Sequence, residues 1–194
     1  MSTSTNSVTP APKVVVLRGP PGAGKSTVSS VLLAKLRAEN GPNRMVAYIE
    51  QDYFRKGILG HPGADGVVAS KIMEGAIHSA NEAGYDCLCE GMLTLPKHGA
   101  FIDRLRIQYG ADLVLLYLSV DLEETLKRHA DRDKAKDIPS KKIVEWNKLC
   151  QPTGLPYEMV MQNNSLETTV EQIIVTMGLD GPEPAPKRAN YDSD

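Results

Sequence analysis

Apolar residues along the chain form short continuous runs that alternate with stretches in which they recur every three or four positions. The continuous runs are typical of buried strands, and the periodic stretches predict amphipathic helices. We expect strands over residues 13–18, 45–49, 87–89, 113–118 and 160–161. We expect helices over residues 25–41, 68–84 and around 101–110, from 121 onwards, and over 140–150 and 166–177. Asp121 with Glu124 resembles a capping box, and Ser140 can cap the helix that it opens.

Strands separated by helix-length segments imply right-handed crossovers, and therefore a parallel sheet covered by helices on both faces. The predicted fold is an α/β three-layer sandwich with a five-stranded parallel sheet. Ligands of such sheets gather outside the carboxyl ends of the strands, so chemistry is expected there. The length of 194 residues predicts one domain, over residues 13–180. A Ser/Thr/Pro-rich segment at 1–12 and a Pro-rich one at 181–194 predict a disordered leader and tail.

Composition and charge narrow the class of protein. Lys and Arg total 22 against 24 Asp and Glu, so the net charge of −2 argues against a nucleic-acid coat or a membrane-surface binder. Three cysteines, at 87, 89 and 150, are too few for a disulfide scaffold or a four-ligand zinc site. No apolar run is long enough for a membrane span, and no secretory signal is evident. We therefore expect a cytoplasmic protein with reduced, buried thiols.

The segment after the first strand carries the strongest motif. Residues 19–26 fit G-x-x-x-x-G-K-[ST], and they follow a predicted strand and open a predicted helix. Backbone N–H groups of such a loop surround phosphate, Lys25 supplies a cation, and the Ser26 hydroxyl can ligate Mg²⁺. The predicted nucleotide-binding residues of this segment are Gly19, Pro20, Pro21, Gly22, Ala23, Gly24, Lys25, Ser26 and Thr27.

Other phosphate-loop classes fit the sequence less well. A GTPase needs Asn-Lys-x-Asp, whereas residues 147–150 read Asn-Lys-Leu-Cys, and no Asp-x-x-Gly follows the third strand. A mechanochemical ATPase normally needs a longer chain and a strand ending in Asp-Glu, but the third strand ends in Glu90-Gly91. A small phosphotransferase with a short helical lid remains.

Two carboxylates follow predicted strand ends. Asp52, after the second strand, can accept the proton of an attacking hydroxyl, or it can merely cap a turn. Glu90, at the end of the third strand, can hold Mg²⁺ through water or bind a substrate hydroxyl, or it can be a solvated strand end. Gly91 permits close approach of a ligand to the backbone.

A basic segment follows the fourth strand. Arg128 and Arg132 lie four residues apart, and the charged stretch after them breaks at Pro139, as a mobile lid over about 127–142 would. A lid arginine that reaches the γ-phosphate stabilises transition-state charge. The alternative is a solvated basic helix face.

Four blocks taken in order resemble the P-loop kinase group of zeta-toxin-type and polynucleotide kinases. They are residues 19–26, Asp52-Tyr53-Phe54-Arg55, Glu90-Gly91-Met92-Leu93, and 115–129. The resemblance implies a nucleoside-kinase-like fold, Asp52 as the base, Arg55 as a substrate or phosphate contact, and Glu90 in the substrate and metal shell. It further implies that Arg128 stacks on adenine, that Arg132 clamps phosphate, and that Asn163 and Asn164 border the base. Met92 departs from the small hydroxyl residue that is usual there.

The predicted function is ATP- and Mg²⁺-dependent transfer of a phosphoryl group to a hydroxyl of a small molecule such as a nucleoside or sugar. The acceptor would enter over Asp52, Arg55, Glu90 and the segment 93–104. The polar groups of that segment, Lys97, His98 and Arg104, can either contact the acceptor or be ordinary surface residues, and the second is the expectation. One alternative is a nucleotide-binding regulator with little phosphotransfer. Another is a polynucleotide 5′-hydroxyl kinase, which the near-zero charge disfavours. The oligomeric state is not encoded in these patterns.

Overall fold

The five predicted strands form one parallel sheet in a computed structural model that describes residues 11–38, 44–61, 65–131, 137–162 and 165–179. The strand order is β2-β3-β1-β4-β5, and every neighbouring pair is parallel. The strands are β1 (Val14–Arg18), β2 (Val46–Glu50), β3 (Asp86–Gly91), β4 (Leu113–Leu118) and β5 (Glu158–Met161). The prediction of an α/β fold with a five-stranded parallel sheet is therefore confirmed.

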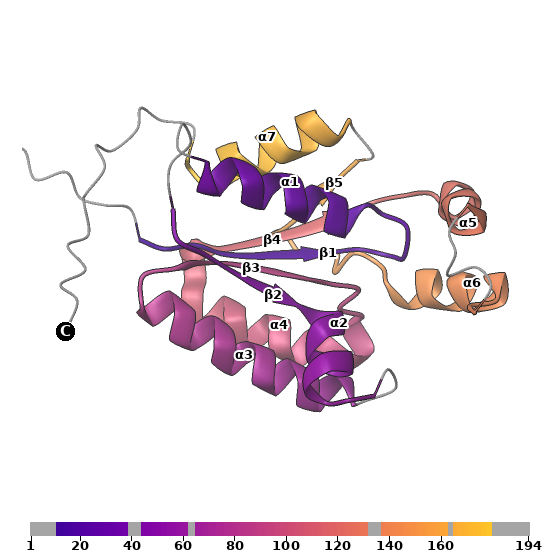
Figure 1. The fold of residues 1–194 in the computed structure, drawn as a ribbon, viewed down its shortest axis with the longest axis horizontal. Coiled ribbons are helices and arrows are strands. Elements are labelled where there is room, and N and C mark those ends of the chain that lie inside the picture. Colours follow the sequence, from indigo (N-terminus) through magenta and orange to yellow (C-terminus); the bar gives the residue numbers. More distant parts are fainter. Residues whose placement is uncertain (1–10, 39–43, 62–64, 132–136, 163–164, 180–194) are drawn as a thin grey trace, which may run out of the picture.

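Helices cover both faces of this sheet, as the crossovers require (Figure 1). Helices α1 and α7 lie on one face, α3 and α4 lie on the other, and α5 and α6 lie beyond the edge where the strands end. The helices are α1 (Lys25–Arg37), α2 (Gln51–Tyr53), α3 (Gly66–Glu82), α4 (Leu95–Tyr109), α5 (Leu122–Ala130), α6 (Ser140–Leu149) and α7 (Leu166–Thr176). A π-helical turn, Phe54–Ile58, follows α2, and a 3₁₀ turn, Gly110–Asp112, precedes β4.

Burial on both faces explains why the strands read as continuous apolar runs. In β1, Val15 and Leu17 pack toward α1 and α7, whereas Val14 and Val16 pack toward α3 and α4. Cys87 and Cys89 belong to the second of these clusters and Cys150 is also buried, so the prediction of free, buried thiols is confirmed. Burial raises the pKa of the Cys87 thiol to about 12.

Two helix starts differ from the capping prediction. Asp121 occupies the N-cap of α5, but its side chain makes no capping hydrogen bond. Glu124 instead accepts a hydrogen bond from Arg128 Nε at 2.7 Å, so its carboxylate is not turned back toward the helix start. Ser140 is the first residue of α6, and Pro139 occupies the N-cap.

Other helices begin earlier than their apolar periodicity indicates. Helix α3 begins at Gly66, because Asp65 accepts a hydrogen bond from Val67 N at 2.8 Å and so caps it. Helix α4 begins at Leu95, with a proline in its first turn, where proline is tolerated. The π-helical turn after α2 was not predicted.

Several predictions concern residues outside the described part of the chain. The leader and tail fall largely on residues 1–10 and 180–194, and the centre of the predicted lid falls on 132–136. Among the described residues, no helix combines the length and the apolar character needed to cross a membrane.

Candidate active site

The glycine-rich loop joins β1 to α1 at the carboxyl edge of the sheet. Gly22 and Gly24 have φ angles of 79° and 88°, in the left-handed region that favours glycine. At Gly19 a Cβ atom would lie 2.6 Å from the Leu118 carbonyl oxygen, so the loop passes β4 too closely for a side chain. The loop therefore has the strand–loop–helix setting that its motif requires.

Lys25 is held against this loop. Its Nζ donates hydrogen bonds to the carbonyl oxygens of Gly19 and Pro20, each at 2.9 Å. The ammonium group thus lies at the start of the loop, where backbone curvature and the amino end of α1 favour an anion.

Glu90 is buried and receives hydrogen bonds from hydroxyl groups. The residue is 3% exposed; Ser26 Oγ donates to its Oε1 at 3.0 Å and Ser29 Oγ donates to its Oε2 at 3.1 Å. Burial together with the negative charge of Glu90 raises the pKa of the nearby Tyr48 phenol. Glu90 is therefore not a solvated strand end, and the structure brings it to Ser26.

The Ser26–Glu90 pair fits a magnesium ion. A hydroxyl and a carboxylate are hard oxygen ligands, and Mg²⁺ is typically bound by one or two protein groups together with substrate phosphates. Within the part of the chain that the structure describes, no group of three or more His, Cys, Asp or Glu side chains could hold a metal. A metal at this pair would complete its coordination with water molecules and phosphate oxygens.

A cavity of about 310 Å³ lies beside the loop and is lined in part by residues of α1 and α7. Arg128 lines it, and Arg128 Nη1 donates to the Gly22 carbonyl at 3.0 Å while Nε pairs with Glu124. The other lining residues are Gly22, Ala23, Gly24, Thr27, Val28, Leu118, Ser119, Gln162, Leu166 and Thr169. The structure thus brings Arg128 to the loop, together with residues of β4 and α7 that sequence reasoning missed.

Asp52 lies within the short helix α2, which directly follows β2, and therefore not at a turn. Its carboxylate pairs with Lys56 Nζ at 2.6 Å and with Arg55 at 3.7 Å. Its side chain is 46% exposed, so solvent or a ligand can reach it. Because β2 and β1 are parallel members of one sheet, Asp52 and the glycine-rich loop lie at the same edge.

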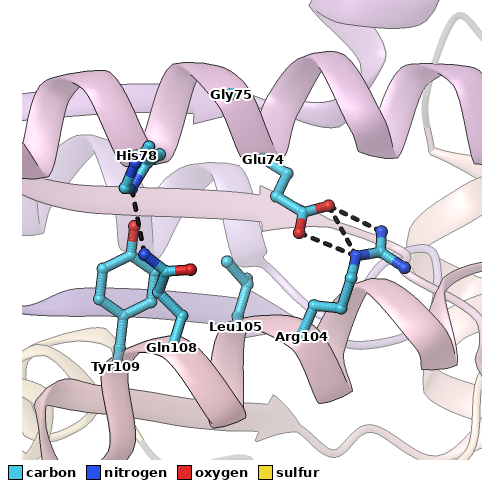
Figure 2. Close-up of a pocket in the computed structure, with 7 residues that line it drawn as sticks. All are labelled: Glu74, Gly75, His78, Arg104, Leu105, Gln108 and Tyr109. Carbon is cyan, nitrogen blue, oxygen red and sulfur yellow. Dashed lines mark hydrogen bonds and ion pairs between the residues drawn. The ribbon is translucent and has the colours of Figure 1, made fainter.

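Arg104 lies apart from these residues. It makes a two-pronged ion pair with Glu74 of α3, with Nε–Oε1 at 2.8 Å and Nη2–Oε2 at 2.7 Å (Figure 2). Helix α4 begins at Leu95 and runs back across the sheet, so Arg104 lies nine residues, or ~13.5 Å of helical rise, beyond the start of the helix. The structure therefore does not place Arg104 with the other predicted substrate residues.

Three further predictions have different outcomes. His98, expected at the surface, is 3% exposed, and desolvation lowers its pKa. The space that Gly91 leaves is taken by Gln51 and not by a ligand, because a Cβ there would lie 2.5 Å from Gln51 Oε1. Arg132, Asn163 and Asn164 lie outside the described residues.

The sheet order and the loop between β1 and α1 define a P-loop kinase fold. A sequence model of the family described as "Zeta toxin" matches residues 2–151. The chain therefore belongs to the Zeta toxin family, and so to the ATP-dependent kinases. This confirms the resemblance noted in the sequence. Among curated proteins, no sequence matches the chain.

Solved structures with this fold include several kinases. The APS kinase CysC of Mycobacterium tuberculosis, in complex with AMPPNP and APS, is 18% identical with a TM-score of 0.69 and covers 88% of this chain and 99% of its own. A sugar kinase from Janibacter sp. HTCC2649 is 16% identical with a TM-score of 0.67, covering 87% and 96%. A gluconokinase from Sinorhizobium meliloti 1021 is 17% identical with a TM-score of 0.61, covering 88% and 94%. At these identities the likeness shows the fold.

Proposed function

We propose that this protein transfers the γ-phosphoryl group of ATP to a hydroxyl group of a small molecule such as a nucleoside or sugar, with Mg²⁺ as cofactor. The observation that carries the proposal is the buried Glu90 carboxylate, 3.0 Å from the Ser26 hydroxyl at the first turn of α1. The Ser26 hydroxyl and the Glu90 carboxylate are hard oxygen ligands that would hold the Mg²⁺ accompanying a transferable γ-phosphoryl group.

The nucleotide side follows from the loop and the cavity. The triphosphate would lie on the backbone N–H groups of residues 19–24 and on Lys25. The cavity of about 310 Å³ beside the loop would take the base, with the Arg128 guanidinium against its face. Ser26 and Glu90 would hold Mg²⁺, which neutralises charge that develops on the phosphate oxygens.

The acceptor side follows from Asp52. Asp52 would take the proton of the acceptor hydroxyl as its oxygen forms the new bond to the γ-phosphorus. The bond from that phosphorus to the β–γ bridging oxygen breaks, and ADP leaves with the electron pair. Arg55, which pairs with Asp52 at 3.7 Å, would contact the acceptor or the moving phosphoryl group. Arg132 would clamp the phosphate from the lid.

A small hydroxyl acceptor is favoured over a polynucleotide. Structures that share the fold include a sugar kinase and a gluconokinase, and also a component of the Pnkp1/Rnl/Hen1 RNA repair complex, of which this chain covers 47%. Non-specific contact with a polynucleotide backbone relies on excess positive charge, and this chain carries a net charge of −2.

We further propose that residues 13–180 form the kinase domain, with a lid over about 127–142 and with the leader and tail outside it. Closure of such a lid would exclude water, so that the acceptor is phosphorylated in place of solvent. The three buried free thiols support a reducing, cytoplasmic setting.

The proposal is tested by incubating the protein with γ-labelled ATP and a defined mixture of nucleosides and sugars, with and without Mg²⁺. Label on an organic acceptor that requires Mg²⁺ is the expected result. Release of free phosphate alone, or no reaction, would favour the nucleotide-binding regulator. Label on a 5′-hydroxyl oligonucleotide and on no small molecule would favour the polynucleotide kinase.

A further inference from the structure

Leu93 has an unusual backbone conformation at the acceptor side of the site. Its φ angle of 39° is the one positive φ among the described residues other than glycine. Its side chain is fully buried, and it lies in the short link between the end of β3 and the start of α4. A bulky residue persists in this region only where its surroundings enforce the conformation, and such residues concentrate at functional sites.

Two buried side chains hold this link from opposite sides. Arg18 Nε donates to the Leu93 carbonyl oxygen at 3.2 Å. Gln51 Oε1 accepts from Met92 N at 3.0 Å and lies 3.5 Å from Leu93 N. Arg18 is the last residue of β1, directly before the phosphate loop, and Gln51 directly precedes Asp52. The link is thereby tied to the nucleotide side and to the proposed base.

Arg18 is fully buried, and each of its three guanidinium nitrogens donates a hydrogen bond. Besides Leu93, its Nη1 donates to Glu158 Oε1 at 2.6 Å and its Nη2 donates to the Gln151 carbonyl at 2.8 Å. Its guanidinium carbon lies 5.2 Å from the centre of the Tyr117 ring. Gln151 lies just after α6, so one side chain joins the phosphate loop, the link after β3 and the segment that follows the lid region.

The energetics favour a positioning role over a stabilising one. The Arg18 and Glu158 side chains are 0% and 1% exposed, and a buried ion pair contributes little net stability relative to well-packed apolar residues. A planar fork with fixed donor directions, however, holds three acceptors in one geometry, which lysine cannot do.

Gln51 is itself held in orientation. Its Nε2 lies 2.7 Å from His98 Nε2, and His98 Nδ1 lies 3.0 Å from the Thr94 carbonyl oxygen. With the Gln51 amide donating to Nε2, the second ring nitrogen carries the proton and donates to Thr94. The amide orientation and the tautomer are thus assigned by one network, which leaves Gln51 Oε1 to accept from the link.

We propose that Arg18 and Gln51 are positioning residues that clamp the Met92–Leu93 link, and thereby set the acceptor side of the site relative to the phosphate loop and Asp52. The inference rests on the proposed function and adds to it two residues that lie outside the loop motif and outside the proposed metal pair. Loosening the clamp would displace the acceptor from the γ-phosphate while leaving the nucleotide site in place.

The test uses Arg18→Lys, which keeps a cation beside Glu158 but loses the fork. Arg44→Lys is the matched control, because Arg44 pairs with the buried Asp86 at the opposite end of β3. Three quantities are measured in the full chain: the affinity for a fluorescent ATP analogue with Mg²⁺, hydrogen exchange of the Met92 and Leu93 amides, and label transfer from ATP to the nucleoside and sugar mixture.

For Arg18→Lys we expect nucleotide affinity within about twofold of wild type, amide exchange about tenfold faster in the link, and transfer lower by ~10²-fold. Arg44→Lys should lower thermal stability without changing the exchange of Met92 or Leu93. Gln51→Met should reproduce the effects of Arg18→Lys. The double variant should lose less transition-state stabilisation in label transfer than the two single variants lose together. If Arg18→Lys does not fold, Gln51→Met and the paired change Arg18→Met with Glu158→Gln carry the same test.

Unchanged exchange of the link in a folded Arg18→Lys protein would overturn the clamp. The clamp would also be overturned if Arg18→Lys transferred label at the rate of the wild-type protein, because the positive charge at residue 18 would then be sufficient without the guanidinium fork. A wild-type protein that labels no acceptor would instead overturn the proposed function, and the exchange measurement would still decide whether Arg18 holds the link.

Discussion

At the scale of single residues, the site depends on polar groups that are buried and fully engaged. Glu90 is the clearest example, since two serine hydroxyls hold its carboxylate in place. Hydrogen bonds of this kind fix the orientation of a carboxylate, which matters for the metal-binding role proposed for Glu90. Asp52 differs, because it is half-exposed and paired with cations on its own helical segment.

Replacement of Glu90 by Gln is expected to weaken Mn²⁺ binding to the protein–ATP complex by about 10–100-fold, because the charged ligand is lost while the shape is kept. ATP binding without metal should change little. Titration of Mn²⁺ followed by electron paramagnetic resonance measures this affinity. Ser30→Ala removes an exposed hydroxyl that hydrogen-bonds the Ser26 carbonyl on the same helix, and it serves as the control. Equal Mn²⁺ affinity in Glu90→Gln and wild type would remove Glu90 from the metal site.

At the scale of elements, helix starts were the least predictable feature. Apolar spacing located α3 and α4, but it marks only the buried face, so both helices begin before their first apolar periodic residues. The cap of α3 is a real hydrogen bond from Val67 N to Asp65, whereas Asp121 occupies a cap position without one. An aspartate at the N-cap position therefore does not by itself show that its side chain stabilises the helix, because only one of these two makes the capping hydrogen bond.

Asp65→Ala is expected to lower the free energy of unfolding by about 1 kcal/mol, because α3 loses a side-chain cap. Asp121→Ala should lower it by a smaller amount, since no side-chain cap bond is broken. Urea denaturation of both variants beside wild type measures the difference. Equal losses, or a larger loss for Asp121→Ala, would contradict the capping assignment.

At the scale of the whole molecule, much of the fold and part of the site follow from sequence pattern. The alternation of strand and helix, the glycine-rich loop, and the strand-end positions of Asp52 and Glu90 are local signals, which one chain can reveal. Arg18, Gln51 and His98 could not be assigned in this way, because their roles arise from contacts with residues 41 to 140 positions away in sequence. The start of α4 determines which turns of that helix lie near the strand ends, and the pattern around Arg104 does not reveal that start.

Stability should depend on pH through His98. Burial lowers its pKa below the ordinary value of 6.5, so the unfolded chain takes up this proton more readily than the folded one. The stabilising contribution of the neutral ring is present above about pH 6.5 and is lost as the pH falls toward the folded-state pKa. Thermal unfolding between pH 7.5 and 5 should show a steeper loss for wild type than for His98→Gln. Parallel curves for the two proteins would refute this assignment.

The central claim is transfer of the γ-phosphoryl group to an organic hydroxyl with Asp52 as the base, and one comparison tests it most directly. Wild type and Asp52→Asn are incubated side by side with γ-labelled ATP, Mg²⁺ and the nucleoside and sugar mixture, and the affinity of each for a fluorescent ATP analogue is measured. We predict label on an organic acceptor in wild type, transfer lower by ~10²–10⁴-fold in Asp52→Asn, and nucleotide affinity within about twofold. Equal transfer by the two proteins, or label released only as free phosphate by wild type, would contradict the account.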